Sequence, residues 1–220
     1  MTHPPLSATL FDLDDATRRL VRLAAAAAGA TESVVRESLV DALDTVPAIW
    51  VEELLLQTHL FAGFPRALNA MRVWRRVSGR PASAAPTPAS TADSEATARE
   101  ERSEVEAGER TCAAVYGSMY ERLRANVRAL HPELDAWMVA DGYGKVLSRP
   151  GLDLARRELC IVAACVASGQ DRQLHSHLHG SLNVGVAREV TYAAIAALAG
   201  IVDAARIHDA TQLAARVYAS

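Results

Sequence analysis

The segment of residues 156–185 constrains the fold more than any other part of the chain. Residues 159–166 are all apolar, and Ser168 and Gly169 follow them with the stop and turn signals of a helix end. After the turn, leucines recur at every fourth position from 174 to 182, which is the period of one helix face. The segment therefore predicts a buried helix, a tight turn and a second, amphipathic helix.

The rest of the chain also carries helical patterns. No segment shows the alternation of apolar and polar residues that is typical of a β-strand, so the predicted class is all-α. The expected helices cover residues 15–28, 32–43, 47–62, 65–74, a stretch up to Leu130, a new start at Pro132, and two final helices divided near Gly200, with turns expected at Gly142, Gly144 and Pro150.

Composition excludes several classes of protein. The chain has 220 residues, of which 50% are hydrophobic and 22% charged, so it can bury a sizeable core. The net charge of −3 gives no basic field for nucleic acid, and no apolar run reaches the roughly 18 residues of a membrane span. Three cysteines, two of them within an apolar helix, are typical of a reduced, cytoplasmic protein.

A change of composition divides the chain. Residues 78–98 consist mainly of Pro, Ala, Ser and Thr, which leave little apolar surface to offset the entropy of ordering. The charged run that follows is expected to form a partly exposed helix. We therefore predict a first helical unit over 1–77, a linker over 78–109 that is disordered in part, and a second helical unit over 110–220.

The two units resemble each other. A shift of 137 residues superposes identical residues in four places, at Glu52 and Glu189, Ala62 and Ala199, Gly63 and Gly200, and Ala67 and Ala204. Two copies of one helical unit are the simplest explanation, because one copy alone would bury its apolar faces poorly. A chance alignment of alanine-rich helices stays open. Val40 stands where the second copy has His177, so one polar site per chain is expected.

Polar residues gather around the predicted turn. Glu158 lies on the first helix, and Gln173 and His177 lie four residues apart on the second, where their side chains share one face. His175 and His179 also share a face, but residues two apart on a helix diverge by roughly 200°, so His177 cannot join them around one ion. Without a further ligand cluster we expect no metal and interpret His175 and His179 as surface histidines.

Three stretches carry a resemblance to a known family: LSRPGLDLARREL at 147–159, QLHSHLHGSLNVGVAREV at 173–190, and LLLQTHLFAGFPRALNAM at 54–71. Together they resemble the carboxymuconolactone decarboxylase family, whose fold is shared with the AhpD-like alkylhydroperoxidases. The resemblance implies an all-α bundle made of two repeated units of this type. It also implies self-association, with a homotrimer expected for a chain that contains two units.

The resemblance also assigns residues. AhpD-like peroxidases use a Glu, a Cys-x-x-Cys pair and a His, and the corresponding positions here are Glu158, Gln170, Gln173 and His177. Thiol exchange needs an attacking thiolate and a resolving thiol, which two amides cannot supply. A peroxiredoxin-type redox protein is therefore the disfavoured alternative, since Cys160 and Cys165 also lack an electropositive setting.

The decarboxylase branch of the family implies a carboxy-lyase that acts on a small anionic lactone or carboxylic acid. A conjugated carbonyl can accept the electrons released with CO2, so no cofactor is expected. His177 is expected to donate the proton or bind the enolate, Glu158 to set the imidazole tautomer, and Gln173 to orient the ligand. The residues expected to contact substrate are Arg149 or Arg157, which suit a carboxylate, and His59, which is expected to close the pocket.

Two further interpretations stay open. Glu158 could simply stabilise the start of its helix, and His177 could be a satisfied core histidine. In that case the protein is a non-catalytic helical scaffold or ligand-binding protein.

Overall fold

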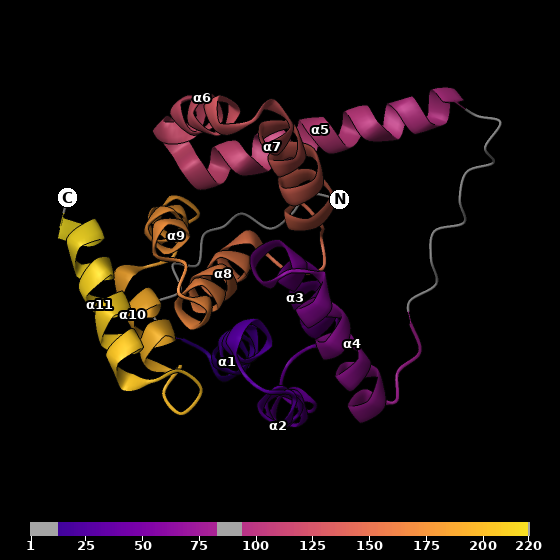
Figure 1. Cartoon of the computed structure of the whole chain (residues 1–220). Coiled ribbons are helices and arrows are strands. Elements are labelled where there is room, and N and C mark those ends of the chain that lie inside the picture. Colours follow the sequence, from indigo (N-terminus) through magenta and orange to yellow (C-terminus); the bar gives the residue numbers. More distant parts are fainter. Residues whose placement is uncertain (1–12, 83–93, 220) are drawn as a thin grey trace.

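A computed structural model describes residues 13–82 and 94–219 (Figure 1). The elements in these ranges are helices, which confirms the all-α class. Their bounds are α1 Asp15–Gly29, α2 Glu32–Ala42, α3 Ala48–Ala62, α4 Phe64–Ser78, α5 Ser94–Tyr116, η1 Gly117–Met119, α6 Tyr120–Leu130, α7 Pro132–Trp137, η2 Met138–Leu147, α8 Leu154–Ser168, α9 Asp171–Asn183, α10 Arg188–Ala196 and α11 Ala204–Ala219. None of these described helices combines the length and apolar character needed to cross a bilayer.

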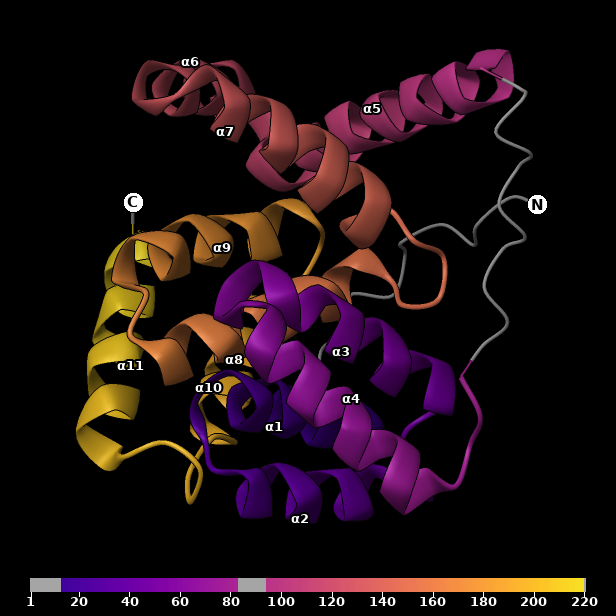
Figure 2. The ribbon, with the colours of Figure 1, turned by 45° about the vertical axis from the view of Figure 1, so that its right-hand side comes forward.

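The centre of the molecule is the packed pair α1 and α8 (Figures 1 and 2). Small residues let the two helices approach closely: the alanines at 24–28 are buried, and a Cβ on Gly29 would lie 2.8 Å from the carbonyl oxygen of Ala167. Helix α8 also packs against α3, α9, α10 and α11. Burial on all sides explains why its sequence is almost continuously apolar.

Local signals set the helix ends near the predicted positions. Asp14 caps α1 by accepting a hydrogen bond from the Thr17 N–H at 2.7 Å, and Asp153 caps α8 by accepting one from the Arg156 N–H at 2.9 Å. Gly169 ends α8 in the left-handed conformation, at φ 71°. The predicted helix, turn and helix of residues 156–185 are therefore confirmed as α8 and α9.

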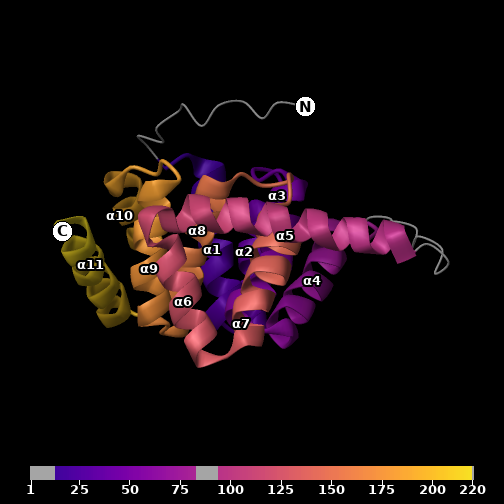
Figure 3. The ribbon, with the colours of Figure 1, turned by 90° about the horizontal axis from the view of Figure 1, so that it is seen from above.

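Helices α5, α6, α7 and η2 form a layer over the bundle, and from above α5 runs across it with α4 and α11 at opposite sides (Figure 3). The expected turns at Gly142 and Gly144 are wrong, because residues 138–147 form the π-helix η2. Gly108 and Gly144 instead allow α5 and η2 to cross at close distance. A Cβ on Gly144 would lie 2.3 Å from the Glu104 carbonyl oxygen, and one on Gly108 would lie 2.0 Å from that of Val139.

The described part of the expected linker is helical from residue 94 onward. Residues 94–109 form the start of α5, most of their described side chains are exposed, and residues 83–93 lie outside the described residues. Helices α1 to α4 and α8 to α11 follow one another in the order that a 137-residue repeat requires. The repeat itself, and the division at 77 and 110, stay predictions.

Candidate functional site

Glu158 and His177 form a buried pair between α8 and α9. The Nδ1–H of His177 donates to Oε2 of Glu158 at 2.8 Å, and the side chains are 5% and 0% exposed. An ionised carboxylate can only accept, so this contact fixes the proton on Nδ1 and leaves Nε2 as the basic nitrogen. A carboxylate behind an imidazole is the arrangement that general acid–base catalysis uses.

Gly180 lets the two helices bring this pair together. It lies on α9, one turn after His177, and a Cβ there would be 2.7 Å from Oε2 of Glu158 and 2.8 Å from Cγ1 of Val115. Any larger residue would therefore displace the carboxylate. Sequence analysis did not single out Gly180, because a glycine within a helix gives no sign of which neighbour approaches it.

The second oxygen of Glu158 is unsatisfied. Oε1 is buried and has no hydrogen-bond partner among the described residues. Buried polar atoms are almost always hydrogen-bonded, and an exception in a folded protein calls for an explanation such as a bound water or a catalytic role. A carboxylate that merely stabilised its helix would not need this environment.

Two aromatic rings from distant segments meet the imidazole of His177, and a third packs against one of them. The ring of Phe61 on α3 meets the imidazole edge-on at 5.5 Å between centroids, and Tyr116 on α5 does so at 6.3 Å. Tyr143 on η2 packs against Tyr116 at 6.2 Å. Burial, with a contribution from the charge of Glu158, raises the pKa of Tyr116 to about 12 and that of Tyr143 well above its usual value. Both phenols therefore stay neutral hydrogen-bond donors.

A second polar cluster, the Glu53 cluster, joins α3 to α8. It consists of Glu53, Gln57, Arg149 and Arg157. Arg149 Nε donates to both Glu53 oxygens, at 3.0 and 2.9 Å, and Arg157 Nη2 donates to Oε2 at 2.8 Å. Burial works to raise the pKa of Glu53, but the two arginines outweigh it and hold that pKa below its usual value.

Arg157 is fully buried within this cluster. Besides its bond to Glu53, it donates from Nη1 to Gln57 Oε1 at 3.0 Å and also donates to the carbonyl oxygens of Leu152 and Arg149. These contacts join α8 to the first half of the chain. Of the two arginines expected at a substrate carboxylate, only Arg149 has a partly exposed side chain.

Residues 132–216 match the family model described as the carboxymuconolactone decarboxylase family. This part of the chain is therefore similar to the carboxymuconolactone decarboxylase family. The match contains Glu158 and His177 and confirms the resemblance predicted from their motifs. No curated protein matches the chain.

Glutamines stand at the two positions, 170 and 173, where the resemblance to AhpD-like peroxidases would place cysteines. Gln170 and Gln173 are both exposed, and no hydrogen bond joins Gln173 to Glu158 or His177 in the ranges described. The three cysteines are free and buried. Burial raises the pKa of Cys112 and Cys165 to about 12, and that of Cys160 higher still. None of them is therefore a reactive thiolate at neutral pH.

His59 lies near the end of α3, where its side chain contacts Leu56 and Phe64 of its own part of the chain. Its Nδ1 lies 2.6 Å from the Leu56 carbonyl oxygen, and its ring stacks on Phe64 with centroids 4.6 Å apart. The ring of the first half that meets the imidazole of His177 is that of Phe61. No local pattern distinguishes Phe61 from the other apolar residues of its helix, so sequence analysis missed it.

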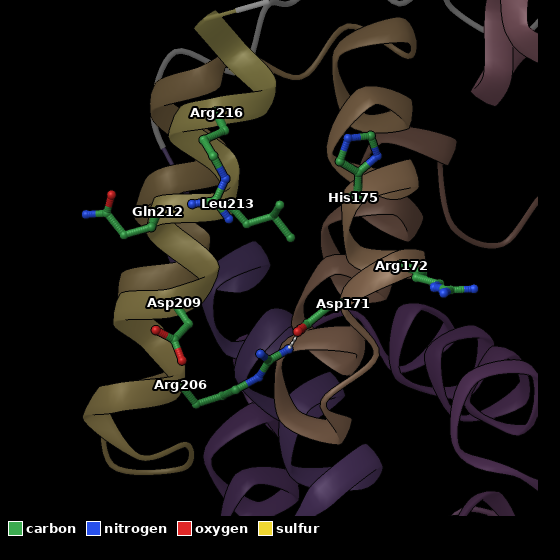
Figure 4. A pocket seen from close by; sticks show the side chains of 8 residues that line it. All are labelled: Asp171, Arg172, His175, Arg206, Asp209, Gln212, Leu213 and Arg216. Atoms are coloured by element: carbon green, nitrogen blue, oxygen red, sulfur yellow. Dashed lines mark ion pairs between the residues drawn. The ribbon is translucent and has the colours of Figure 1, made fainter.

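A hollow of about 710 Å³ lies between α9 and α11, and His177 is not among its lining residues (Figure 4). Arg206 reaches across it to pair with Asp171 at 2.5 Å, whereas Arg172 points away. His175 lines this hollow and meets His179 edge-on at 5.0 Å. In the described part of the chain, no three His, Cys, Asp or Glu side chains gather as a metal site would require.

Proposed function

We propose that Glu158 and His177 carry out cofactor-free acid–base chemistry on a small carboxylated carbonyl compound, with decarboxylation of an unsaturated lactone as the reaction. The observation that carries this proposal is the buried pair with one carboxylate oxygen left unsatisfied. The family match over residues 132–216 supports the reaction class. A purely structural carboxylate would be expected to have both oxygens bound, as Glu53 has.

The reaction needs one proton transfer and one place for electrons. The bond between the ring carbon and the carboxylate breaks, CO2 leaves, and the electron pair moves through the conjugated system onto the lactone carbonyl oxygen. Nε2–H of a protonated His177 then delivers its proton to carbon, and solvent restores that proton. Glu158, bound to Nδ1, balances the positive charge of the imidazolium before the transfer.

Arg149 is the arginine that we propose at the substrate carboxylate. Arg149 keeps 46% of its side chain exposed while its Nε binds Glu53, so part of its guanidinium can meet a carboxylate. Gln173 and His59 would contact the substrate only at the surface, since neither hydrogen-bonds to the pair. The buried contacts of Arg157 fit a role in joining the helices, and the proposal does not use it.

The direct test is turnover of carboxymuconolactone, followed by CO2 release and by NMR of the product formed in D2O. The wild-type chain should release CO2 and place one deuteron on the ring carbon next to the lactone carbonyl, because the former carboxyl-bearing carbon becomes part of the new double bond. His177→Gln should lose at least about 100-fold in kcat, the effect of removing a proton-transfer group, while the exposed His175→Gln should match the wild type. Equal rates for the His177 and His175 variants would leave only a ligand-binding or scaffold role.

Self-association and location are further proposals. Phe64 and Leu68 lie one turn apart on α4 and are 65% and 53% exposed, which favours burial against another copy. We propose a homotrimer, and light scattering after size exclusion would show a mass of about 70 kDa if it forms, three times the 23.5 kDa of the chain. Three free, buried cysteines support a reducing, cytoplasmic setting.

A further inference from the structure

Tyr116 is held beside the proposed site by backbone contacts. It is the last residue of α5, and the Asn183 side chain of α9 donates from Nδ2 to the carbonyl oxygen of the preceding Val115 at 2.8 Å. The following residue, Gly117, has φ 54° and begins η1. These contacts fix the end of α5 against α9 without using the phenol. The Tyr116 oxygen accepts a hydrogen bond from the Tyr143 hydroxyl, which leaves the proton of Tyr116 for another acceptor.

The side chain of Tyr116 faces the pair. Its ring lies edge-on to the imidazole of His177 at 6.3 Å, and the charge of Glu158 contributes to the raised pKa of its hydroxyl. The neighbouring Tyr143 is only 5% exposed and lies behind it, whereas Tyr116 is partly exposed. Of the two phenols, Tyr116 is therefore the one that an entering molecule can meet.

The proposed reaction requires a donor that the pair does not supply. Negative charge develops on the carbonyl oxygen while His177 delivers its proton to carbon, so a separate group must stabilise that oxygen. Among the described residues no Lys or Arg forms an ion pair with Glu158, and Arg157 is bound to Glu53. A phenol whose pKa is about 12 stays protonated at neutral pH and can donate.

We infer that Tyr116 is a catalytic residue of this site, whose hydroxyl donates a hydrogen bond to the substrate oxygen that gains charge. The inference rests on the proposed function and names its substrate class, which is a conjugated carbonyl compound. In the bound state the carbonyl oxygen would lie on the α5 side of His177, and the reacting carbon would face Nε2. Phe61, which lies on α3 in the first half of the chain, would supply an apolar wall for such a planar molecule.

The test compares Tyr116→Phe with Tyr192→Phe, a matched control whose ring packs on Tyr218 at 5.7 Å, away from the pair. Two readouts are used: kcat with carboxymuconolactone, and binding of 4-nitrophenolate, an anion that resembles an enolate, followed by its absorbance. Tyr116→Phe should lower kcat about 100- to 1,000-fold with little change in KM, the effect of losing one oxyanion donor. It should also weaken 4-nitrophenolate binding about 10-fold, and Tyr192→Phe should change neither.

The outcomes separate this inference from the proposed function. If the wild type turns over, His177→Gln is inactive and Tyr116→Phe keeps full kcat, the role of Tyr116 is refuted and the proposed function stands. If Tyr116→Phe weakens 4-nitrophenolate binding while carboxymuconolactone is not consumed, Tyr116 is supported and the substrate is wrong.

Replacement of Tyr116 by 3-fluorotyrosine covers the case in which the phenylalanine variant fails to fold. The fluorinated phenol keeps the shape of the side chain and is a stronger hydrogen-bond donor. It should bind 4-nitrophenolate more tightly than the wild type does. Unchanged binding would count against the proposed hydrogen bond.

Discussion

Glu53 and Glu158 are both buried carboxylates, on α3 and α8, but their surroundings differ. Glu53 accepts hydrogen bonds from two arginines, and both of its oxygens are bound. Glu158 accepts one hydrogen bond, from His177, and its other oxygen has no partner in the ranges described. Burial alone therefore does not distinguish the two acids, whereas the number and charge of their partners does.

The difference follows from electrostatics. A buried charge is tolerated when opposite charge and hydrogen bonds replace the lost water. The Glu53 cluster meets this requirement, so it joins two helices and has no spare capacity. In the pair of Glu158 and His177, only one carboxylate oxygen has a hydrogen-bond partner in the ranges described. The other oxygen could therefore accept a hydrogen bond from a ligand.

The largest expected effect is on stability, through the Glu53 cluster. Arg157→Met removes four hydrogen bonds, two to α3 and two to the chain before α8, and leaves the buried Glu53 with Arg149 alone. The free energy of unfolding in urea should fall by about 3–5 kcal/mol. The exposed Arg172→Met should change it by less than about 0.5 kcal/mol. A similar stability for both variants would show that the cluster does not hold the halves together.

The next effect is on activity, through the other acid. Glu158→Gln keeps the shape of the side chain and removes the charge that supports the imidazolium. We expect kcat to fall about 100-fold or more, while unfolding in urea changes by about 1 kcal/mol or less. Glu189→Gln, at an exposed position of α10, is the control. A loss of stability as large as that of Arg157→Met, with activity kept, would reverse the roles assigned to the two acids.

Gly180→Ala tests how tightly the carboxylate of Glu158 is held, because the substitution has two opposing effects on stability. Alanine is favoured over glycine inside a helix by about 1 kcal/mol. Against this, the new Cβ would lie 2.7 Å from Oε2 of Glu158, and such crowding costs about 1–3 kcal/mol. We expect a net loss of stability measured by thermal unfolding, together with reduced activity. A more stable, fully active variant would mean that the carboxylate is free to move.

The smallest effect is on the response to acid. The arginines keep the pKa of Glu53 below its usual 4.5, so the folded state holds this carboxylate ionised where the unfolded state protonates it. Its contribution to stability is complete above about pH 4.5 and is lost as pH falls through the lowered pKa. Stability measured between pH 6 and pH 3 should decline less steeply for Glu53→Gln than for the wild type, and equal slopes would contradict this.

The sequence predicted those features that depend on neighbours along the chain. The four-residue spacing of leucines and the stop at Gly169 defined α8 and α9, and the same local pattern placed Glu158 and His177 on facing helices. Phe61 and Tyr116 depend on packing between segments far apart in the chain, which no local pattern encodes. Arg157 was expected at a substrate because the sequence does not show that Glu53 lies beside it.

The π-helix η2 was missed for a different reason. Glycines at 142 and 144 normally indicate turns, and here Gly144 permits a backbone crossing with α5. The same residue type serves both purposes, and only the position of the partner helix distinguishes them.

The boundaries of the family match and the boundaries of a stable fragment do not coincide. A protein trimmed to residues 132–216 would lose α1, the packing partner of α8, and would leave the guanidinium of Arg157 without the carboxylate that neutralises it. It would also lack the rings of Phe61 and Tyr116. A fragment cut at the family limits should therefore be less stable than the full chain, because the apolar face of α8 that packs on α1 would be exposed to water.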